Sequence, residues 1–366
     1  MLKVLQKRKE LMKLIQQIVD DKGYFDVYDL EAVAGLPRST LQDWINRFMD
    51  DGCIEMLEER AGRKRARYAL RRVRNLPASA CRKIFTTVDG DNVEIFHECR
   101  SEGCIAFCEY MYTIGNPLVR KNGLVLRQRV KAGTIITPNN ASLDLEKVVV
   151  KDGLVYQHIR TFGGPAYSLT EMMEQADGVL DVKYVKKGDY VEGVIVTEAL
   201  THLAIGVDDT DSPDSGATFA LTLSLLDVLT SIEGVHRISH NVGFLYPGVP
   251  FKTAGNAVSY IEMGVKRTLV DSTIKAALEY VRSQTRSGET GMAVKIGLKN
   301  CPVLVDFMIK ARNGIVTEEE ALAVAKKSRL KIYEITGKRG IIGAVASLGM
   351  MEYQPEKLMD VSQDLG

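Results

Sequence analysis

The sequence predicts a multidomain α+β protein with a small N-terminal helical module, a central α+β domain and a C-terminal α/β domain. The chain has 366 residues, which implies two or three domains at roughly 100–200 residues per domain. Helical spacing of apolar residues marks the region 1–75, whereas short apolar runs between Gly and Asn turns fill 80–200. Strand and helix patterns then alternate through 201–352.

The composition is typical of a globular protein from a reducing compartment. Apolar residues make up 45% and charged residues 26% of the chain, and the formal net charge is +1. Such a balance creates no overall field toward nucleic acid or a membrane, so these partners must be argued from local charge. Six cysteines, no secretory signal and apolar runs far shorter than ~20 residues predict a cytoplasmic protein with reduced thiols and no membrane partner.

The N-terminal module follows the order helix, helix, turn, helix, hairpin. Ser39 and Thr40 are expected to cap the third helix, and Gly52 ends it. The order resembles a winged helix-turn-helix module, with 37–50 as the recognition helix and 58–68 as the wing. The predicted helices and strands of this module cover 7–21, 27–34, 39–50, 53–58 and 67–70.

Positive charge favours contact between this module and nucleic acid. Between Arg60 and Arg74 lie eight Lys or Arg residues and no acid. A cationic wing can bind phosphates, where released counterions supply affinity independent of sequence. A solvated linker or a protein-interaction module would carry the same charge, and a winged helix can also act as a homodimer. The candidate contacts are Arg38, Ser39, Thr40, Gln42, Arg63, Lys64, Arg65 and Arg67.

A boundary at Asn75-Leu76-Pro77 separates this module from the central region, 80–200, whose role the sequence does not indicate. There, strands are expected at 124–130 and 147–150, a helix at 169–176, and a hairpin from 178–185 to 190–196. In the C-terminal domain, strands are expected at 203–207, 235–241, 257–262 and 331–336, and helices at 217–232, 271–283 and 318–329.

An acid-rich loop follows the first strand of the C-terminal domain. Asp208, Asp209 and Asp211 crowd into four residues, which costs Coulomb repulsion unless a cation or hydrogen-bond donors neutralise them. Magnesium binds one or two carboxylates together with phosphate oxygens, and the next helix offers free amides near Gly216–Thr218. An Asp-rich turn that only caps the helix is an equally simple interpretation.

Two further loops carry cations. The segment PFKTAGN at 250–256 holds Lys252, whose ammonium can neutralise phosphate charge. The Gly-rich segment GKRGIIGA at 337–344 opens an apolar helix and can cradle phosphates with backbone amides. Neither has the spacing of a P-loop, and each alone is an ordinary turn before a helix or strand.

Together, IGVDDTDS, PFKTAGN and KRGIIGA resemble the catalytic kinase-like domain of the archaeal agmatinylcytidine synthetase that modifies an isoleucine tRNA. The sequence resembles the methanogenesis marker protein 11 family still more, in Gly216-Ala217-Thr218, Leu245-Tyr246-Pro247 and GETGMAV at 288–294. The second resemblance extends more weakly through residues 85–200. The C-terminal domain is therefore expected to be kinase-like.

The resemblance implies ATP and Mg²⁺ as cofactors. By position, Thr218 corresponds to the threonine that the synthetase phosphorylates during its reaction, and Lys252 and Arg339 would face phosphates. The synthetase phosphorylates a cytidine carbonyl oxygen, which an amine then displaces. The candidate catalytic residues are Asp208, Asp209, Asp211 and Thr218, of which the three aspartates are the metal ligands. The candidate nucleotide-binding residues are Thr210, Ser212, Lys252, Thr253, Asn256, Arg339 and Gly340.

Some features depart from the synthetase. Its zinc ribbon would follow the kinase-like domain, whereas this sequence has no C-x-x-C pair, so we do not expect agmatine and tRNA to carry over as substrates.

Cys99, Cys104 and Cys108, close to His97, match no standard metal spacing. They can bind a metal, act as reactive thiols or pack as small apolar groups, and the sequence leaves these options open.

The sequence thus leaves three functions. The first is an ATP- and magnesium-dependent transferase or ligase acting on an RNA base or a protein in archaeal, methanogen-type metabolism. The second is a nucleotide-sensing, DNA-binding transcription regulator, which the N-terminal module favours. The third is an inactive assembly factor. The complete set of carboxylates, Lys252 and Thr218 favours the enzyme.

Overall fold

The computed structural model divides the chain into two compact units, Met1–Pro77 and Ala78–Gly366, and each is described by itself. No helix in the described part of the chain is long and apolar enough to cross a membrane. The described residues are 2–50, 53–60, 65–70, 81–113, 119–135, 143–162, 169–252, 255–299, 301–353 and 355–360.

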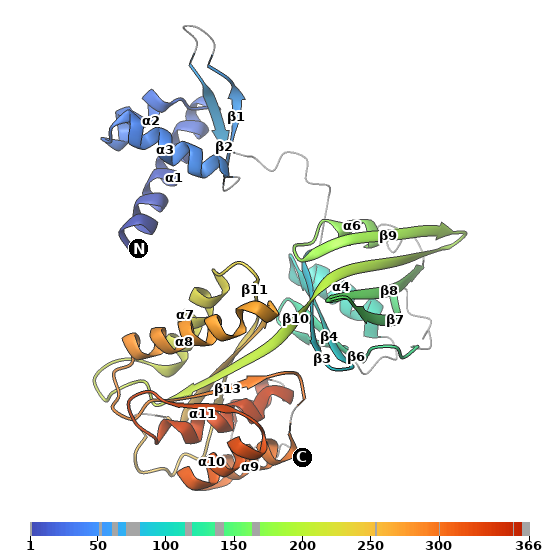
Figure 1. Ribbon diagram of the computed structural model, residues 1–366, viewed down its shortest axis with the longest axis vertical. Helices are drawn as coiled ribbons and strands as arrows, with labels where there is room; N and C mark the ends of the chain where they lie inside the picture. Colours follow the sequence, from blue (N-terminus) through green and yellow to red (C-terminus); the bar gives the residue numbers. More distant parts are fainter. Residues whose placement is uncertain are drawn as a thin grey trace. The chain divides into compact units, whose positions relative to one another are not determined.

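The N-terminal unit contains three helices and a two-stranded antiparallel hairpin (Figure 1). Leu11, Ile15 and Val19 recur every four residues along the first helix and are buried against the rest of the unit. A capping box between Asp26 and Asp29 starts the second helix. The elements are α1 (Leu2–Lys22), α2 (Val27–Ala34), α3 (Arg38–Asp50), β1 (Ile54–Glu58) and β2 (Arg67–Leu70).

The predicted order of elements in this unit is present, but two boundaries were wrong. Helix α1 begins at Leu2 instead of residue 7. Helix α3 begins at Arg38, so Ser39 and Thr40 lie inside its first turn and do not cap it. The amide of Leu41 already donates to the carbonyl of Pro37, at 3.0 Å, which closes that turn. The winged helix-turn-helix assignment itself stays a prediction.

The second unit is built on one large sheet with helices packed against it. Its first part holds β3 (Cys81–Asp89), β4 (Asn92–Cys99), α4 (Glu102–Thr113), β5 (Val119–Asn122), β6 (Val125–Lys131), β7 (Leu143–Lys151), β8 (Leu154–Phe162), α6 (Leu169–Glu174), β9 (Val179–Lys187) and β10 (Tyr190–Asp208). Then follow α7 (Thr218–Thr230), β11 (Val235–Phe244), β12 (Ala257–Val265), α8 (Val270–Gln284), β13 (Gly291–Ile296), α9 (Pro302–Asn313), α10 (Glu318–Lys327), β14 (Lys331–Glu334), α11 (Gly340–Gly349) and α12 (Pro355–Leu358).

Strand β10 joins the two predicted domains of this unit. The sequence predicted separate strands at 190–196 and 203–207, whereas the structure has one strand of 19 residues. Its first half pairs with β8 and β9, and its second half pairs with β12 and β13, all antiparallel. The pairing around Asp208 therefore differs from the α/β pattern expected for the C-terminal domain. A domain boundary at residue 200 stays a prediction.

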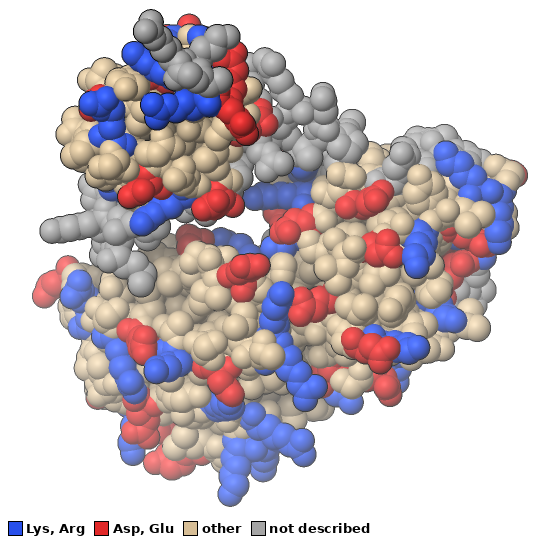
Figure 2. Space-filling view, turned by 45° about the horizontal axis from the view of Figure 1, so that its top comes forward, with Lys and Arg blue, Asp and Glu red and all other residues tan. Residues whose placement is uncertain are grey.

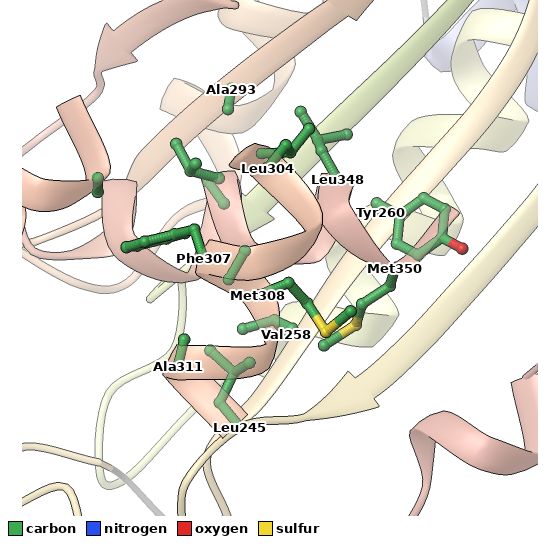
Figure 3. Close-up of a cluster of buried hydrophobic side chains, with 14 of the residues drawn as sticks. Leu245, Val258, Tyr260, Ala293, Leu304, Phe307, Met308, Ala311, Leu348 and Met350 are labelled. Atoms are coloured by element: carbon green, nitrogen blue, oxygen red, sulfur yellow. The ribbon is translucent and has the colours of Figure 1, made fainter. Parts of the chain in front are cut away.

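The C-terminal half of β10 is buried on both faces. Leu203, Ile205 and Val207 pack under α7 and α8, whereas Ala204 packs toward α9 and α11 (Figure 1). A methyl group on Gly206 would overlap the carbonyl oxygen of Ala344, so glycine lets α11 approach the strand closely. Figure 3 shows the second apolar layer, a buried cluster with residues from α9, β12 and α11. The labelled residues are Leu304, Phe307, Met308, Ala311, Val258, Tyr260, Leu245, Ala293, Leu348 and Met350.

A buried ionic network connects β4 and β6 to β10 and β12. Arg127, only 4% exposed, donates two hydrogen bonds to Glu94, at 3.1 and 3.2 Å, and two to Glu262, both at 2.9 Å. Glu262 also accepts from the Ser239 hydroxyl at 2.5 Å, and His202 Nε2 lies 3.1 Å from it. Burial alone would raise the pKa of Glu262, but Arg127 and the hydrogen bonds hold that pKa well below its usual range.

This network makes Arg127→Met destabilising. The change leaves Glu94 and Glu262 buried and facing each other, which is expected to cost about 3–5 kcal/mol of unfolding free energy at neutral pH in denaturant titrations. In the wild type, the pKa of Glu262 is lower in the folded state than its unfolded value of ~4.3, which stabilises the folded state at pH above ~4.3. This contribution is lost as the pH falls through the folded-state pKa. The variant's deficit should therefore shrink in acid, where its carboxylates are protonated.

Arg237→Met is the matched control, because Arg237 forms an exposed pair with Asp227 at 2.6 Å. Its loss should change the unfolding free energy by less than about 1 kcal/mol. Equal, pH-independent losses in the two variants would contradict a stabilising role for the buried network.

Candidate active site

A cavity of about 440 Å³ opens where β10 ends, and it collects most of the predicted site residues. The acidic loop, the start of α7, the loop before β12, the end of α9 and the start of α11 all contribute to its wall. Its polar and charged lining residues are Asp208, Asp209, Asp211, Thr218, Lys252, Asn256 and Arg339.

Asp208 ends β10, and its carboxylate lies against α11. A methyl group on Gly343 would overlap Asp208 Oδ2, so only glycine leaves room for the carboxylate. Burial, with repulsion from Asp209 and Asp211, raises the pKa of Asp208 to about 8, although the Asp209 amide and Arg339 act in the opposite direction. Burial is the larger cause, so a cation beside Asp208 would favour its ionised form.

Asp209 is already held by donors. It adopts a left-handed conformation, with φ of +56°, which Asp tolerates better than most residues. Arg339 Nε donates to its Oδ2 at 2.8 Å, and the Ser287 hydroxyl donates to its Oδ1 at 3.0 Å. The Thr290 hydroxyl donates to its carbonyl oxygen at 2.7 Å. The acidic loop is thus tied to the segment before β13 and to the start of α11.

Thr218 is connected to the acidic loop through its hydroxyl. Its Oγ1 donates to Asp211 Oδ1 at 3.1 Å and lies 3.0 Å from the Thr210 hydroxyl. The Thr210 amide donates to Thr218 Oγ1 at 3.3 Å. Gly216 permits this turn, since its φ is +92° and a methyl group there would crowd Asp211. A hydroxyl next to a carboxylate, both on a cavity wall, is arranged for proton transfer.

The N-terminus of α7 faces the same cavity. Thr218 is the first residue of the helix, and the residue before it, Ala217, makes no side-chain cap. Both line the cavity, together with Gly216 and Phe219. Uncapped amides and the positive end of a helix dipole attract anions such as phosphate.

The two basic loops also reach the cavity. Lys252 Nζ donates to the carbonyl of Pro247, and Asn256 Nδ2 donates to the carbonyl of Tyr246 at 2.9 Å. The guanidinium of Arg339 lies 5.5 Å from the centre of the Phe251 ring. All three polar side chains are among the lining residues. Thr253 lies outside the described residues.

Three predicted residues do not line the cavity. Thr210 is buried and supports Thr218, while Ser212 bonds to Ser215 with hydroxyl oxygens 3.1 Å apart. Gly340 packs against Gly291 and Asp208, and a methyl group there would overlap the Gly291 nitrogen. In the structure, these residues shape the loops that carry the lining side chains. Their predicted contact with nucleotide stays untested.

Sequence reasoning missed a group of residues that organise the basic loop. The Glu289 carboxylate accepts from the amides of Lys338 and Arg339, both at 3.3 Å. Ser287 and Thr290 hold Asp209, as described above. The segment GETGMAV had been noted as a motif, but its spacing did not indicate which partners it would have. The apolar side of the cavity was missed too, and includes Phe219, Val242, Phe244, Phe251, Ile315 and Val316.

In the N-terminal unit, the described cations of the predicted nucleic-acid surface have acidic partners. Arg38 pairs with Glu31 and Arg65 with Asp26, both at 3.2 Å, and Arg67 pairs with Glu58 at 3.5 Å. Figure 2 shows the same mixture, since Asp and Glu lie among Lys and Arg on the face it presents. Ser39 and Thr40 are exposed, Gln42 bonds to Asn46 and Tyr68, and Arg63 and Lys64 lie outside the described residues.

Comparison with known proteins assigns part of this region to a family. The family model of the TiaS TCKD domain matches residues 204–270, which include the end of β10, the acidic loop, α7, β11 and β12. The isoleucine-tRNA 2-agmatinylcytidine synthetase TiaS of Pyrococcus horikoshii is 32% identical over 154 residues, covering 40% of this chain and 35% of the synthetase. This chain therefore matches about a third of the length of that relative.

Among solved structures, the crystal structure of TiaS in complex with its isoleucine tRNA and ATP aligns with a TM-score of 0.37 and 25% identity, over 41% of this chain and 36% of that chain.

A second curated relative resembles more of the chain. Uncharacterized protein MJ0921 of Methanocaldococcus jannaschii is 31% identical over 226 residues, covering 60% of this chain and 73% of that protein. The protein thus contains a TiaS TCKD domain. It belongs to the same family as MJ0921.

The contact between Asp208 and α11 predicts that Gly343→Ala damages the site. Alanine favours a helix over glycine by up to ~1 kcal/mol, so the helix itself should tolerate the change. The new methyl group would instead displace the Asp208 carboxylate. We expect at least a tenfold loss (about 1.4 kcal/mol) of Mg²⁺-dependent ATP affinity in calorimetric titrations.

Gly103→Ala is the matched control. Gly103 also lies in a helix, α4, but a methyl group there would meet no atom within 4 Å, and Gly103 does not line the cavity. Its ATP affinity should match that of the wild type. Equal affinities for both variants would show that the position of Asp208 is not important for binding.

Proposed function

We propose that the cavity binds ATP with Mg²⁺ and that the protein is an ATP-dependent transferase or ligase acting on an RNA base or a protein. One observation carries this proposal: three carboxylates, two cations and the uncapped start of α7 line a single cavity. This combination suits a metal–triphosphate complex, which needs acids for the cation and donors for the phosphates. The match to the TiaS TCKD domain over residues 204–270 supports it.

The acidic loop fits a divalent cation. Burial and the neighbouring carboxylates raise the pKa of Asp208, and a cation at Asp208 and Asp211 would favour the ionised form of both. Asp209 already pairs with Arg339 and accepts a hydrogen bond from Ser287, so its role here is to position the loop and Arg339. When bound, Mg²⁺ would neutralise phosphate charge and polarise the phosphorus toward attack.

Other residues provide for the nucleotide. The amides at the start of α7, with Lys252 and Arg339, can accept the phosphates. Phe219 and Phe251 are 53% and 67% exposed, on the apolar side of the cavity. Exposed aromatic rings beside a phosphate site offer a surface on which a base can stack. The cavity thus has a polar end and an apolar end, as a nucleoside triphosphate requires.

Thr218 is the proposed phosphoryl acceptor within the chain. Its hydroxyl donates to Asp211, which can take the proton while Oγ1 bonds to the γ-phosphorus and ADP leaves. Thr210 holds the same oxygen in place. Phosphorylation of Thr218 would be either an intermediate step before transfer to the final acceptor or a side reaction. RNA is favoured as the final acceptor because the related synthetases are named as tRNA-modifying enzymes.

The N-terminal unit is proposed to contact nucleic acid as a recruiting module. The pairing of Arg38, Arg65 and Arg67 with acids of their own unit weakens the case for a strongly cationic DNA-reading surface. We therefore prefer the enzyme over the transcription regulator.

Asp208→Asn tests the proposal directly. The amide keeps the shape of the side chain but removes the charge that a cation needs. Affinity for ATP in the presence of Mg²⁺ should fall at least tenfold (about 1.4 kcal/mol), with little change in its absence. Asp214→Asn is the control, because Asp214 belongs to the same loop but is exposed and outside the lining. Wild-type affinity in both variants would overturn the proposed site.

The role of Thr218 is tested with ATP labelled in the γ-phosphate. The wild type and Thr218→Ser should incorporate label that peptide mass spectrometry assigns to position 218, since both side chains carry a hydroxyl. Thr218→Val, which keeps the shape, should incorporate none while still binding ATP. Undiminished labelling of Thr218→Val would rule out this residue as the acceptor and leave nucleotide binding intact.

A further inference from the structure

Four of the six cysteines gather in the central part of the second unit, away from the nucleotide cavity. Cys81 begins β3, Cys99 ends β4, and Cys104 and Cys108 lie one turn apart on α4. Cys81, Cys99 and Cys108 are buried in the apolar core of this region, and Cys104 packs against it. None of these four residues forms a disulfide in the structure.

The sulfurs of three of these residues are spaced for a single ion. The Sγ atoms of Cys99, Cys104 and Cys108 all lie within 4.8 Å of one another. Tetrahedral zinc with Zn–S bonds of ~2.3 Å holds its sulfurs about 3.8 Å apart, so small side-chain rotations bring them to bonding distance. An iron–sulfur cubane would need wider spacing, because each cysteine binds a different iron.

Cys81 lies beside this group, although its sulfur is not among the three that lie within 4.8 Å of one another. In the antiparallel pairing of β3 and β4, Cys81 is opposite Cys99, next to a register shift between Cys81 and Lys83. Opposite residues of an antiparallel pair project from the same face of the sheet, so a small movement of this strand end would bring Cys81 to the ion as a fourth ligand. That face carries α4, since Cys81, Cys99 and Cys108 belong to the same buried cluster. His97 is a poorer choice, because it hydrogen-bonds to Gln157.

We propose that Cys99, Cys104 and Cys108 bind one zinc ion, with Cys81 as the fourth thiolate. This site is independent of the proposed nucleotide chemistry. Four thiolates from two strands and a helix form a closed site, which is typical of structural and not catalytic zinc. It would fix α4 onto the sheet.

The packing of α4 indicates why such an anchor is useful. Among residues 102–109, whose side chains the structure describes, only Ile105 and Cys108 are buried. Phe107 is 38% exposed. Within this described part of the helix, two buried side chains provide a small apolar area for holding it on the sheet. A metal bound by Cys104 and Cys108 would add two attachments one turn apart on the same helix face.

The test uses the full-length protein, purified under reducing conditions without chelator. We expect about one zinc ion per chain by elemental mass spectrometry. After chelation and exchange, Co²⁺ should give the intense visible bands of a tetrahedral site together with thiolate-to-metal charge transfer. Removal of zinc should lower the melting temperature, and zinc should restore it.

Single Cys→Ser variants identify the ligands. Cys104→Ser and Cys108→Ser should lose the bound zinc and the Co²⁺ spectrum, while Cys301→Ser, at the start of α9, should keep both. Cys81→Ser decides between four and three thiolates, because loss of charge-transfer intensity indicates that it is a ligand. The titration of the unmutated chain does not depend on the folding of any variant.

Two results would overturn the proposal. One is a folded, reduced wild-type chain that contains no zinc and gives no thiolate-to-Co²⁺ band. The other is a disulfide between Cys99 and Cys108 in protein isolated without oxidant, which would assign the cluster to redox chemistry. Failure of ATP binding would affect neither outcome, since the two sites share no residue.

Discussion

The burial of Asp208 at the end of β10, beside two further carboxyl groups, is the constraint on which the geometry of the cavity depends. Asp208 cannot leave this position, because it is the last residue of a strand paired on both sides, to β12 and β13. Arg339 is brought to Asp209 from 130 residues further along the chain. Arg339 does not offset the burial of Asp208 and its two acidic neighbours, which raise the pKa of Asp208. The cation of a metal-bound nucleotide would favour the ionised form of Asp208.

Strand β10 connects the acidic loop to the rest of the second unit. Its second half is locked between helices on both faces, and its first half is paired with β8 and β9. The buried network around Arg127 attaches β12, the neighbour of β10, to the sheet of the central part. These contacts therefore limit local movement of the acidic loop relative to β10. Such pre-organisation favours electrostatic stabilisation of a transferring phosphoryl group.

The sequence predicted which polar residues line the cavity better than it predicted the sheet. Asp208, Lys252 and Arg339 each stand in a short polar loop between apolar segments, and this pattern can be recognised without knowing how the strands pair. The continuity of β10 could not be predicted, because polar Thr197, Glu198 and Thr201 interrupt its apolar pattern. Thr197 can be buried because its hydroxyl hydrogen-bonds to the hydroxyl of Thr86, with the oxygens 2.8 Å apart. Thr86 is far away in sequence, so this partner is known only from the tertiary structure.

Partners that lie far apart in sequence were beyond prediction for the same reason. Ser287 and Thr290 hold Asp209 from about 80 residues away, and nothing in their own neighbourhood marks them as supports. Gly343 was noted only as part of a Gly-rich loop, although its missing side chain makes room for Asp208.

The most direct test of the account is a crystal structure with Mn²⁺ and a non-hydrolysable ATP analogue. We predict an anomalous peak bonded to Asp208 and to the analogue's phosphates, whereas a metal or analogue bound outside this cavity would contradict it.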